Sequence, residues 1–221
     1  MKIVARTLLV LVVLAASTAA FAQSEAHYSV TFTRVWTQNT HPFEYPEKTL
    51  VSGPHFSGLI GATHNGAYRI YKEGARPTPG LERLSEEGKH SPLDAEIKSA
   101  IASGKAGALF ETGPIRDDGG MEKVEVTVTP KFPMVSAVAM IAPSPDWFAG
   151  AADVNLLEGG KWVASKSVDL YAYDSGGDDG KTYKASDADT NPKKPTMIAN
   201  TPHFLSKGKR VRVATLTFTK L

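Results

Sequence analysis

Apolar and polar residues alternate in several stretches of the chain, which is the pattern of a β-strand with one buried face. The pattern covers residues 28–36, 123–129, 161–173 and 211–219. The side chains expected on the buried faces include Tyr28, Val30, Phe32, Trp36, Val124, Val126, Val128, Trp162, Val168 and Leu170. Each of these stretches is therefore predicted to be a strand that contributes one face to a core.

A nearly continuous apolar run covers residues 134–141 and predicts a central strand that is covered on both faces. Residues 37–66 are rich in Pro, Gly, His and Asn and predict mostly loop, with a short apolar stretch at 56–60. Residues 68–71 fit another short strand. The chain thus contains strands at irregular intervals, separated by turn-rich links.

One helix is predicted from residue 91 onward. Ser91 and Asp94 have the spacing of a capping box, and Pro92 suits the first helical position. Gly104 stands where the helix is expected to stop, and a weaker helical turn is predicted over 80–87. We expect both helices to pack over one edge or end of a sheet. The apolar positions of the longer helix are Leu93, Ile97 and Ile101.

Short strands, turn-rich links and few helices together indicate an all-β protein, an antiparallel β-sandwich with one or two short helices in its connections. No internal repeat and no linker divides the chain. The length of 221 residues suits one domain of ordinary size. A chain of this length can bury a core without covalent cross-links, and it has no cysteine from which to make them.

The first 22 residues have the organisation of a secretory signal peptide. Lys2 and Arg6 form a basic start, residues 8–16 are a short apolar run, and residues 20–22 give an A-x-A cleavage site before Gln23. The run is too short to span a membrane, and no later segment is long and apolar enough to do so. We therefore expect residues 1–22 to be removed and residues 23–221 to form a single domain that is exported to the periplasm or secreted.

Removal of the signal peptide changes the charge balance of the protein. The whole chain has 25 basic and 23 acidic residues, and the mature part keeps 23 of each. A neutral mature protein has no electrostatic reason to bind nucleic acid. The absence of cysteine also excludes a thiol nucleophile and a cysteine-based zinc site.

The densest cluster of acidic residues lies at 174–189, directly after the strand that is predicted to end at Tyr173. Asp174 and Asp178 begin it, and several glycines lie between the carboxylates. Calcium takes about six to eight oxygen ligands, and carboxylates in a glycine-bent loop suit it. The loop does not match the EF-hand pattern. From the residues alone, a solvated acidic loop and a calcium site both remain open.

A second unusual segment, PSPDWF at 143–148, follows the apolar strand. Its prolines fix a turn around Asp146. The aspartate could cap that turn, or it could supply a third carboxylate to the loop at 174–178.

Both segments resemble signatures of the spondin domain family, the domain found in F-spondin and mindin. PSPDWF with Gly150 resembles SPDWxxG, and DLYAYDSGGDDG at 169–180 resembles DLxPWDAGTDSG. THPFEYP at 40–46 and GATH at 61–64 resemble two further stretches of the family. The resemblance runs from about residue 28 to residue 196. On this basis the chain is identified as a bacterial-type, single-domain exported member of the family.

The resemblance implies a sandwich similar to calcium-dependent lipid-binding modules, with one calcium site. Family ligands match Asp146, Asp174 and Asp178, and these three are the metal residues that we predict. The sequence departs from the family in the Ser175 to Gly177 stretch and in lacking the cysteines of animal members. Three carboxylates held together without a cation would repel one another and their pKa values would rise. A bound cation would remove that cost.

Two functions follow as hypotheses. The first is a non-catalytic calcium-binding recognition or adhesion module whose partner is an extracellular or envelope protein or a glycan. The second is an exported metal-dependent hydrolase that uses the same carboxylates, with His64 as a base. Neither an H-E-x-x-H motif nor a G-x-S-x-G elbow is present. His41 and His64 could each be a metal ligand or a base, but a hydrogen-bonded structural role is favoured for both.

Overall fold

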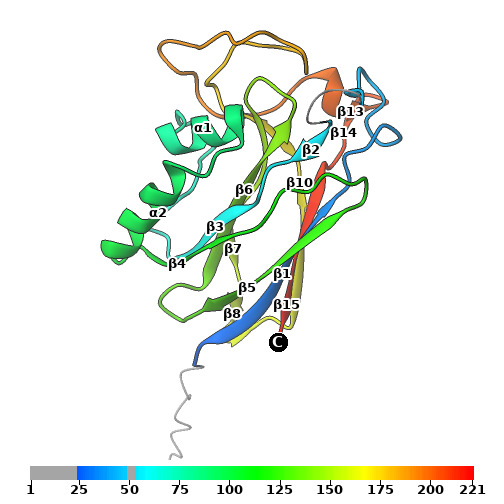
Figure 1. Ribbon diagram of the computed structural model, residues 1–221. Helices are drawn as coiled ribbons and strands as arrows, with labels where there is room; N and C mark the ends of the chain where they lie inside the picture. Colours follow the sequence, from blue (N-terminus) through cyan, green and yellow to red (C-terminus); the bar gives the residue numbers. More distant parts are fainter. Residues whose placement is uncertain (1–23, 49–52) are drawn as a thin grey trace, which may run out of the picture.

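A computed structural model describes residues 24–48 and 53–221 of the chain. Two antiparallel sheets face each other, with two helices beside one of them (Figure 1). The all-β sandwich predicted from the sequence is therefore confirmed. The predicted signal peptide, residues 1–22, lies outside the described residues. Neither helix in the described segments has the length and hydropathy of a membrane-crossing helix.

The first sheet has four strands in the order β10 (Ser165–Leu170), β15 (Ala214–Lys220), β1 (Ala26–Arg34) and β5 (Met121–Val128). One of its two inner strands is β1, in which Val30 lies opposite Phe218 of β15 and Val124 of β5. The buried face of β1 carries the alternating side chains expected from the sequence, because Tyr28, Val30 and Phe32 are all buried.

The second sheet follows the order β12 (Met197–Ile198), β11 (Ala172–Asp174), β7 (Trp147–Asn155), β6 (Met134–Ala142), β3 (Ile60–His64) and β4 (Ala106–Glu111). The short β2 (His55–Phe56) pairs with β6. β6 is central and almost entirely buried, as its apolar run predicts. Two small hairpins, β8 (Leu157–Glu158) with β9 (Lys161–Trp162) and β13 (Leu205–Ser206) with β14 (Lys209–Arg210), lie outside both sheets.

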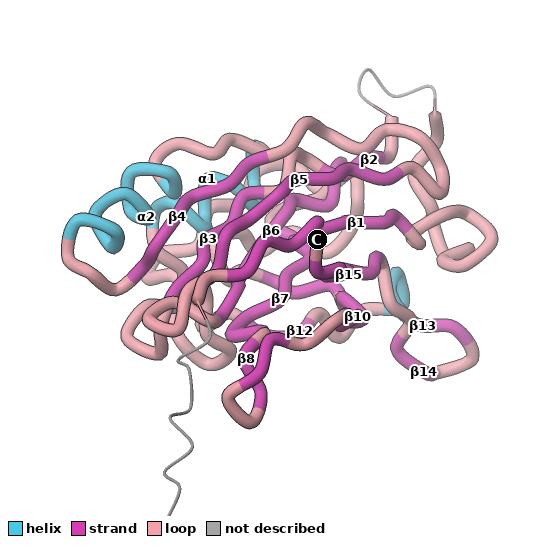
Figure 2. The backbone as a smooth tube through the Cα atoms, turned by 90° about the horizontal axis from the view of Figure 1, so that it is seen from below, coloured by secondary structure: helices cyan, strands magenta, loops and turns pink. Residues whose placement is uncertain are grey.

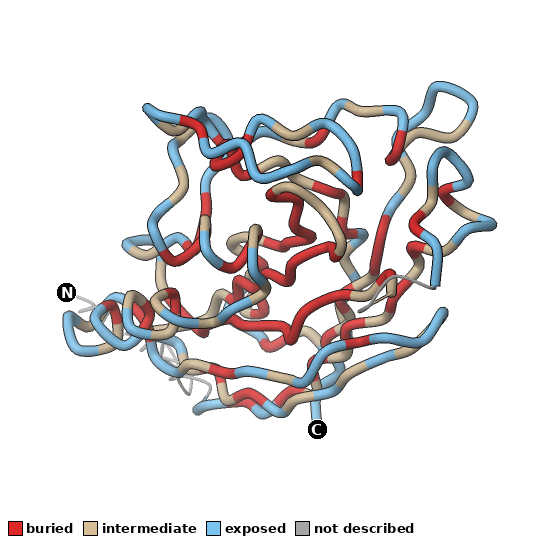
Figure 3. The backbone as a smooth tube through the Cα atoms, turned by 45° about the horizontal axis from the view of Figure 1, so that its top comes forward, coloured by how far each residue is buried: buried red, intermediate tan, exposed pale blue. Residues whose placement is uncertain are grey.

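The main core fills the space between the two sheets. Figure 2 shows the strands of both sheets, in magenta, from below. Burial is concentrated along the strands, while the long connections around them are exposed (Figure 3). Trp36 and Trp162 belong to this core, as predicted, and Trp147 joins them with 2% of its surface exposed.

The two helices bury a second, smaller core against the outer face of the second sheet. α1 (Pro79–Glu87) contacts β6 and β7, and α2 (Leu93–Ala102) contacts β4. α1 is better defined than its sequence suggested, because Thr78 caps its first turn and Gly88 ends it in a left-handed conformation. This helix supports one side of the acidic loop described below.

Several local expectations were wrong. The structure gives α2 no side-chain cap, so Ser91 and Asp94 do not form a capping box there. Residues 68–71 form no strand, and the long strand expected over 161–173 is divided between β9, β10 and β11. β3 lies inside a stretch predicted to be mostly loop, and no strand was expected for β7. Both missed strands contain small residues and are buried at successive positions, so they show no alternation.

Candidate functional site

Two strand ends meet where the conspicuous aspartates lie. Asp146 immediately precedes β7, and Asp174 is the last residue of β11. β7 and β11 pair antiparallel, with Asp174 opposite Trp147. The sheet register therefore places Asp146 and Asp174 close together. The connection that continues from Asp174, drawn in orange at the top of Figure 1, passes above α1.

Asp146 is fully buried, and one of its carboxylate oxygens organises the loop. Its Oδ2 accepts hydrogen bonds from the Ser175 hydroxyl at 2.9 Å and from the backbone amides of Gly176, Gly177 and Asp178 at 2.9, 2.9 and 3.2 Å. Successive amides can converge on one oxygen because Gly176 has a φ of 86°, which favours glycine. The loop thus forms a small nest of donors around one carboxylate.

The other oxygen of the same carboxylate, Oδ1, is buried and has no hydrogen-bond partner. Burial raises the pKa of Asp146 although the four donors oppose the rise. Burial, followed by the charge of Asp146, also raises the pKa of the neighbouring Asp174 to about 6. A buried acceptor without a donor is costly, and a cation would satisfy it. The atoms that could bind a metal here are carboxylate oxygens, which are hard ligands of the kind that calcium prefers.

Asp178 takes a different position from the other two aspartates. It is buried, and its two carboxylate oxygens accept hydrogen bonds of 2.6 Å from the amides of Gly180 and Ala188. Each oxygen keeps a further lone pair. The ligand atoms of Asp146, Asp174 and Asp178 do not all lie within 4.8 Å of one another in the described structure. The structure therefore brings Asp146 and Asp174 together at two strand ends, whereas the carboxylate of Asp178 is bonded to amides of the loop that follows β11.

A second acidic group, which the sequence analysis did not single out, lies on the helix side of the loop. Glu82 and Glu86 of α1 come within 4.8 Å of Asp189, counted between carboxylate oxygens. Lys193 donates to Glu82 at 2.8 Å and also pairs with Asp189, so this group contains its own counter-charge. Burial raises the pKa of Glu86 to about 7. The spacing of four residues between the glutamates was the available signal, but only the fold brings Asp189 to them.

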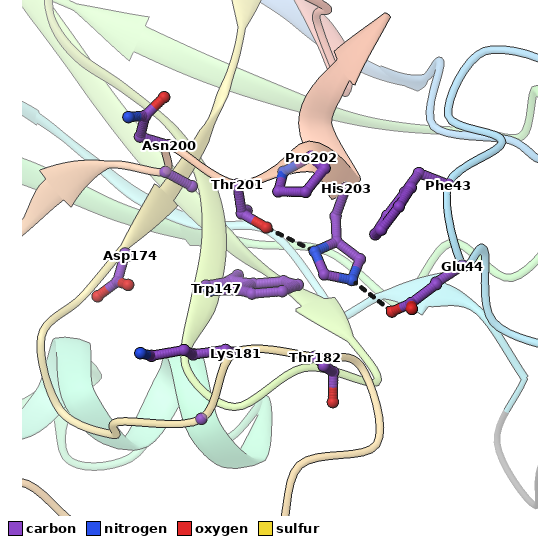
Figure 4. Close-up of a pocket in the computed structure, with 12 residues that line it drawn as sticks. Phe43, Glu44, Trp147, Asp174, Lys181, Thr182, Asn200, Thr201, Pro202 and His203 are labelled. Atoms are coloured by element: carbon purple, nitrogen blue, oxygen red, sulfur yellow. Dashed lines mark hydrogen bonds and ion pairs between the residues drawn. The ribbon is translucent and has the colours of Figure 1, made fainter.

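A pocket of about 540 Å³ opens beside Asp174 (Figure 4). Trp147 lies at its base, and His203 of the 3₁₀ turn η1 (Pro202–Phe204) packs beside it with 5.2 Å between ring centroids. His203 is held on both sides, by Thr201 Oγ1 at 2.6 Å from Nδ1 and by Glu44 Oε2 at 3.1 Å from Nε2. The candidate cation site and an aromatic-lined pocket therefore share one carboxylate.

The two histidines in family-like stretches are buried and hydrogen-bonded within the fold. His64 is fully buried, with Nε2 at 2.7 Å from Ser136 Oγ and Nδ1 at 2.8 Å from the Asn65 carbonyl. His41 is fully buried, with Nδ1 at 2.9 Å from Thr40 Oγ1. None of these hydrogen bonds joins either ring to a carboxylate of the acidic loop.

Comparison with a family model and with individual known proteins points to one family. Residues 26–206 match the family model described as Spondin_N. The chain is similar to Spondin-2 of Rattus norvegicus, with 32% identity over 89% of the chain and 62% of that protein, and to Spondin-2 of Homo sapiens, with 34% identity over 77% and 51%. It is also similar to Spondin-1 of Homo sapiens, with 30% identity over 78% of the chain and 21% of that protein. The chain thus spans about half to three fifths of the Spondin-2 proteins and a fifth of Spondin-1.

Proposed function

Because the chain belongs to the Spondin_N family, we propose that it is an exported, calcium-binding recognition or adhesion-type module without catalytic activity. Asp146, Asp174 and Asp178 hold the cation. The partner is an extracellular or envelope protein or a glycan. Since the chain covers only part of its curated relatives, the site carries this proposal, and the activity of those longer proteins does not.

One observation carries the proposal. The carboxylate of Asp146 is fully buried, one oxygen is saturated by four donors, and the other is buried without any donor. Asp174 lies beside it, and its pKa is raised by burial and by the charge of Asp146. Two coupled, partly desolvated carboxylates would otherwise take up a proton or repel. A divalent cation neutralises both carboxylates and is coordinated by the Asp146 oxygen that has no hydrogen-bond donor.

A cation at this place would join the start of β7 to the end of β11, and Asp178 would add the loop between β11 and β12. It would also offset the like charges of the loop, so the native state would gain stability from it. Free calcium at about 100 times its Kd would add about 2.7 kcal/mol to the free energy of unfolding. For an exported domain without disulfides, this is a substantial part of a typical stability.

Calorimetric titration of residues 23–221 with calcium tests the proposal. We expect one site per chain in the wild type and no measurable heat of binding in Asp146→Asn or Asp174→Asn, since an amide carries no charge. Asp187→Asn is the matched control, because Asp187 is an exposed carboxylate of the same acidic segment. Equal binding by the wild type and both site variants would refute the assignment, and so would the absence of binding in the wild type.

The metal-dependent hydrolase is the less favoured alternative. A metal-assisted hydrolase needs an open coordination position and a base that can reach the attacking water. His64, the base suggested by the sequence, is fully buried and bonded through both ring nitrogens to Ser136 and Asn65. Turnover of ester or phosphoester substrates that disappears in Asp178→Ala would favour the hydrolase over the recognition module.

A further inference from the structure

The pocket beside Asp174 has a rigid aromatic base. Trp147 and His203 are 2% and 3% exposed, and both pack on Phe204 or Tyr183 with ring centroids about 5 Å apart. His203 is fixed by its hydrogen bonds to Thr201 and Glu44, which Figure 4 shows as dashed lines. The base therefore exists before any ligand arrives, which lowers the entropic cost of binding.

An exposed aromatic ring stands at the rim of the pocket. Phe43 is 44% exposed, although its ring is held edge-on against His203 with 5.1 Å between centroids and 81° between planes. A fixed, exposed ring offers apolar contact area at little cost in conformational entropy. Pro202 and Ala199 extend the apolar part of the lining.

The rest of the rim is polar. The carboxylate of Asp174, the amide of Asn200, the hydroxyl of Thr182 and the ammonium group of Lys181 all border the pocket. Within the described residues, the side chains of Lys181, Thr182 and Asn200 make no hydrogen bond to the protein. Planar amide and carboxylate groups can each bind two neighbouring hydroxyl groups of a ligand. These groups are therefore available to a ligand that carries several hydroxyls.

The charges around the pocket narrow the ligand class. Two carboxylates, Asp174 and Glu44, line it against a single lysine. Without a bound cation, a phosphate or another strongly anionic group would face net negative charge. An acyl chain would have to desolvate the polar rim whether or not a cation is bound. A neutral sugar has an apolar ring face that can pack against the aromatic side chains of the pocket, and hydroxyl groups that can hydrogen-bond to its polar rim. A volume of about 540 Å³ is within the range of small-ligand sites.

We propose that this pocket binds a neutral pyranose sugar unit of a glycan, with Phe43 against the ring and Asn200 and Asp174 on its hydroxyls. The inference deepens the proposed function by choosing a glycan as the partner, and it rests on that function through Asp174, which the pocket shares with the cation site. A calcium ion on Asp174 would be within reach of the same hydroxyls, so we expect calcium to strengthen sugar binding.

Saturation-transfer NMR on residues 23–221 tests the proposal. The probes are the methyl glycosides of mannose, galactose, glucose and N-acetylglucosamine, together with glucuronate as an anionic comparison, each in calcium and in a chelator. We expect transfer to at least one neutral glycoside in calcium, about tenfold weaker binding in Phe43→Ala and in Asn200→Ala, and an unchanged calcium titration in both. Met121→Ala is the matched control, because Met121 is an exposed apolar residue outside the pocket lining.

The outcomes separate this inference from the proposed function. Calcium binding without transfer to any neutral glycoside overturns the sugar pocket and leaves the cation site standing. Sugar binding that is sensitive to Phe43→Ala in a protein that binds no calcium supports the pocket and overturns the cation site. Binding of glucuronate alone, or neutral binding unaffected by both pocket variants, also overturns the inference.

Discussion

The hydroxyl of Ser175 donates a hydrogen bond of 2.9 Å to Oδ2 of Asp146, across 29 positions of sequence. This contact fixes the loop after β11 against the residue that precedes β7. It leaves the second oxygen of Asp146 buried without a donor. A single carboxylate thus organises the loop with one oxygen, while its other oxygen has no hydrogen-bond donor.

Replacing Asp146 with alanine should destabilise the protein even when calcium is absent. The change leaves the Ser175 hydroxyl and the Asp178 amide without their acceptor. The amides of Gly176 and Gly177 lose one of their two acceptors and keep Asp174 Oδ1 and Ser175 Oγ. We expect a loss of about 3 kcal/mol in the free energy of unfolding, measured by urea denaturation in a chelator. Asp146→Asn should lose less, because its amide oxygen can still accept.

Asp187→Ala is the control for that measurement and should stay within about 0.5 kcal/mol of the wild type. If Asp146→Ala is as stable as the wild type, the cost of burying the carboxylate outweighs its hydrogen bonds. The loop would then not depend on Asp146 for its conformation.

Asp174→Asn should stabilise the calcium-free protein at neutral pH. The pKa of Asp174 in the fold is about 6, raised by burial and by Asp146, so the fold binds a proton more tightly than the unfolded chain. The associated stability is complete below about pH 4 and is lost as the pH rises through 6. Because Asp174 is only half-buried, we expect the variant to gain roughly 1–2 kcal/mol at pH 7.5 and nothing at pH 4.

The same pair of proteins should reverse its order in calcium, since only the wild type retains both charges for the cation. Thermal unfolding in chelator and in calcium, at pH 4 and pH 7.5, gives the four comparisons. A variant that is less stable than the wild type in chelator at pH 7.5 contradicts the repulsion between Asp174 and Asp146.

Gly176→Ala should destabilise the acidic loop more than the same substitution in a surface hairpin. A Cβ on Gly176 would lie 2.3 Å from the carbonyl oxygen of Lys194, and the residue has a φ of 86°. Gly208 has a similar φ of 73°, but nothing lies within 4 Å of its added Cβ. We expect a loss of about 1 kcal/mol in Gly208→Ala from strain alone.

The loss in Gly176→Ala should be larger by about 2 kcal/mol, because the loop must move to relieve the clash. Its affinity for calcium should fall as well, since the amides that hold Asp146 would shift. Chemical denaturation and calcium titration of both variants measure the two effects. Equal losses would show that the close approach to Lys194 is unimportant.

His41 should make the protein sensitive to mild acid. The side chain is fully buried, and burial lowers its pKa from 6.5 to about 4, so the fold holds it neutral. The stability from this group is complete above about pH 6.5 and is lost as the pH falls toward 4. We expect the wild type to lose about 2–3 kcal/mol over that interval through His41, and His41→Asn to lack that loss. Parallel pH profiles of unfolding free energy for the two proteins would contradict this assignment.

The strands with a clear alternation were predictable from the sequence because each has one face in the core and one in solvent. β1, β5 and β15 follow their patterns closely, with Val30, Val126 and Leu216 among the buried positions. β3 and β7 were not predicted, because they are buried at successive positions but contain small residues such as Gly61 and Gly150. They therefore show neither alternation nor the long apolar run that marked β6. A strand that is covered on both faces by neighbouring layers has no solvent-facing side, so its sequence does not alternate between polar and apolar residues.

The candidate site divides in the same way. The sequence determined which carboxylates exist, that Asp174 and Asp178 lie at and after the end of a strand, and that prolines bend the chain at Asp146. Only the tertiary structure decided that β7 and β11 pair, that one oxygen of Asp146 is used by the loop and the other is free of donors, and that Asp178 braces the loop. Residue types and spacing are local properties of the chain, whereas the burial and the partners of an individual oxygen depend on segments that meet only after folding.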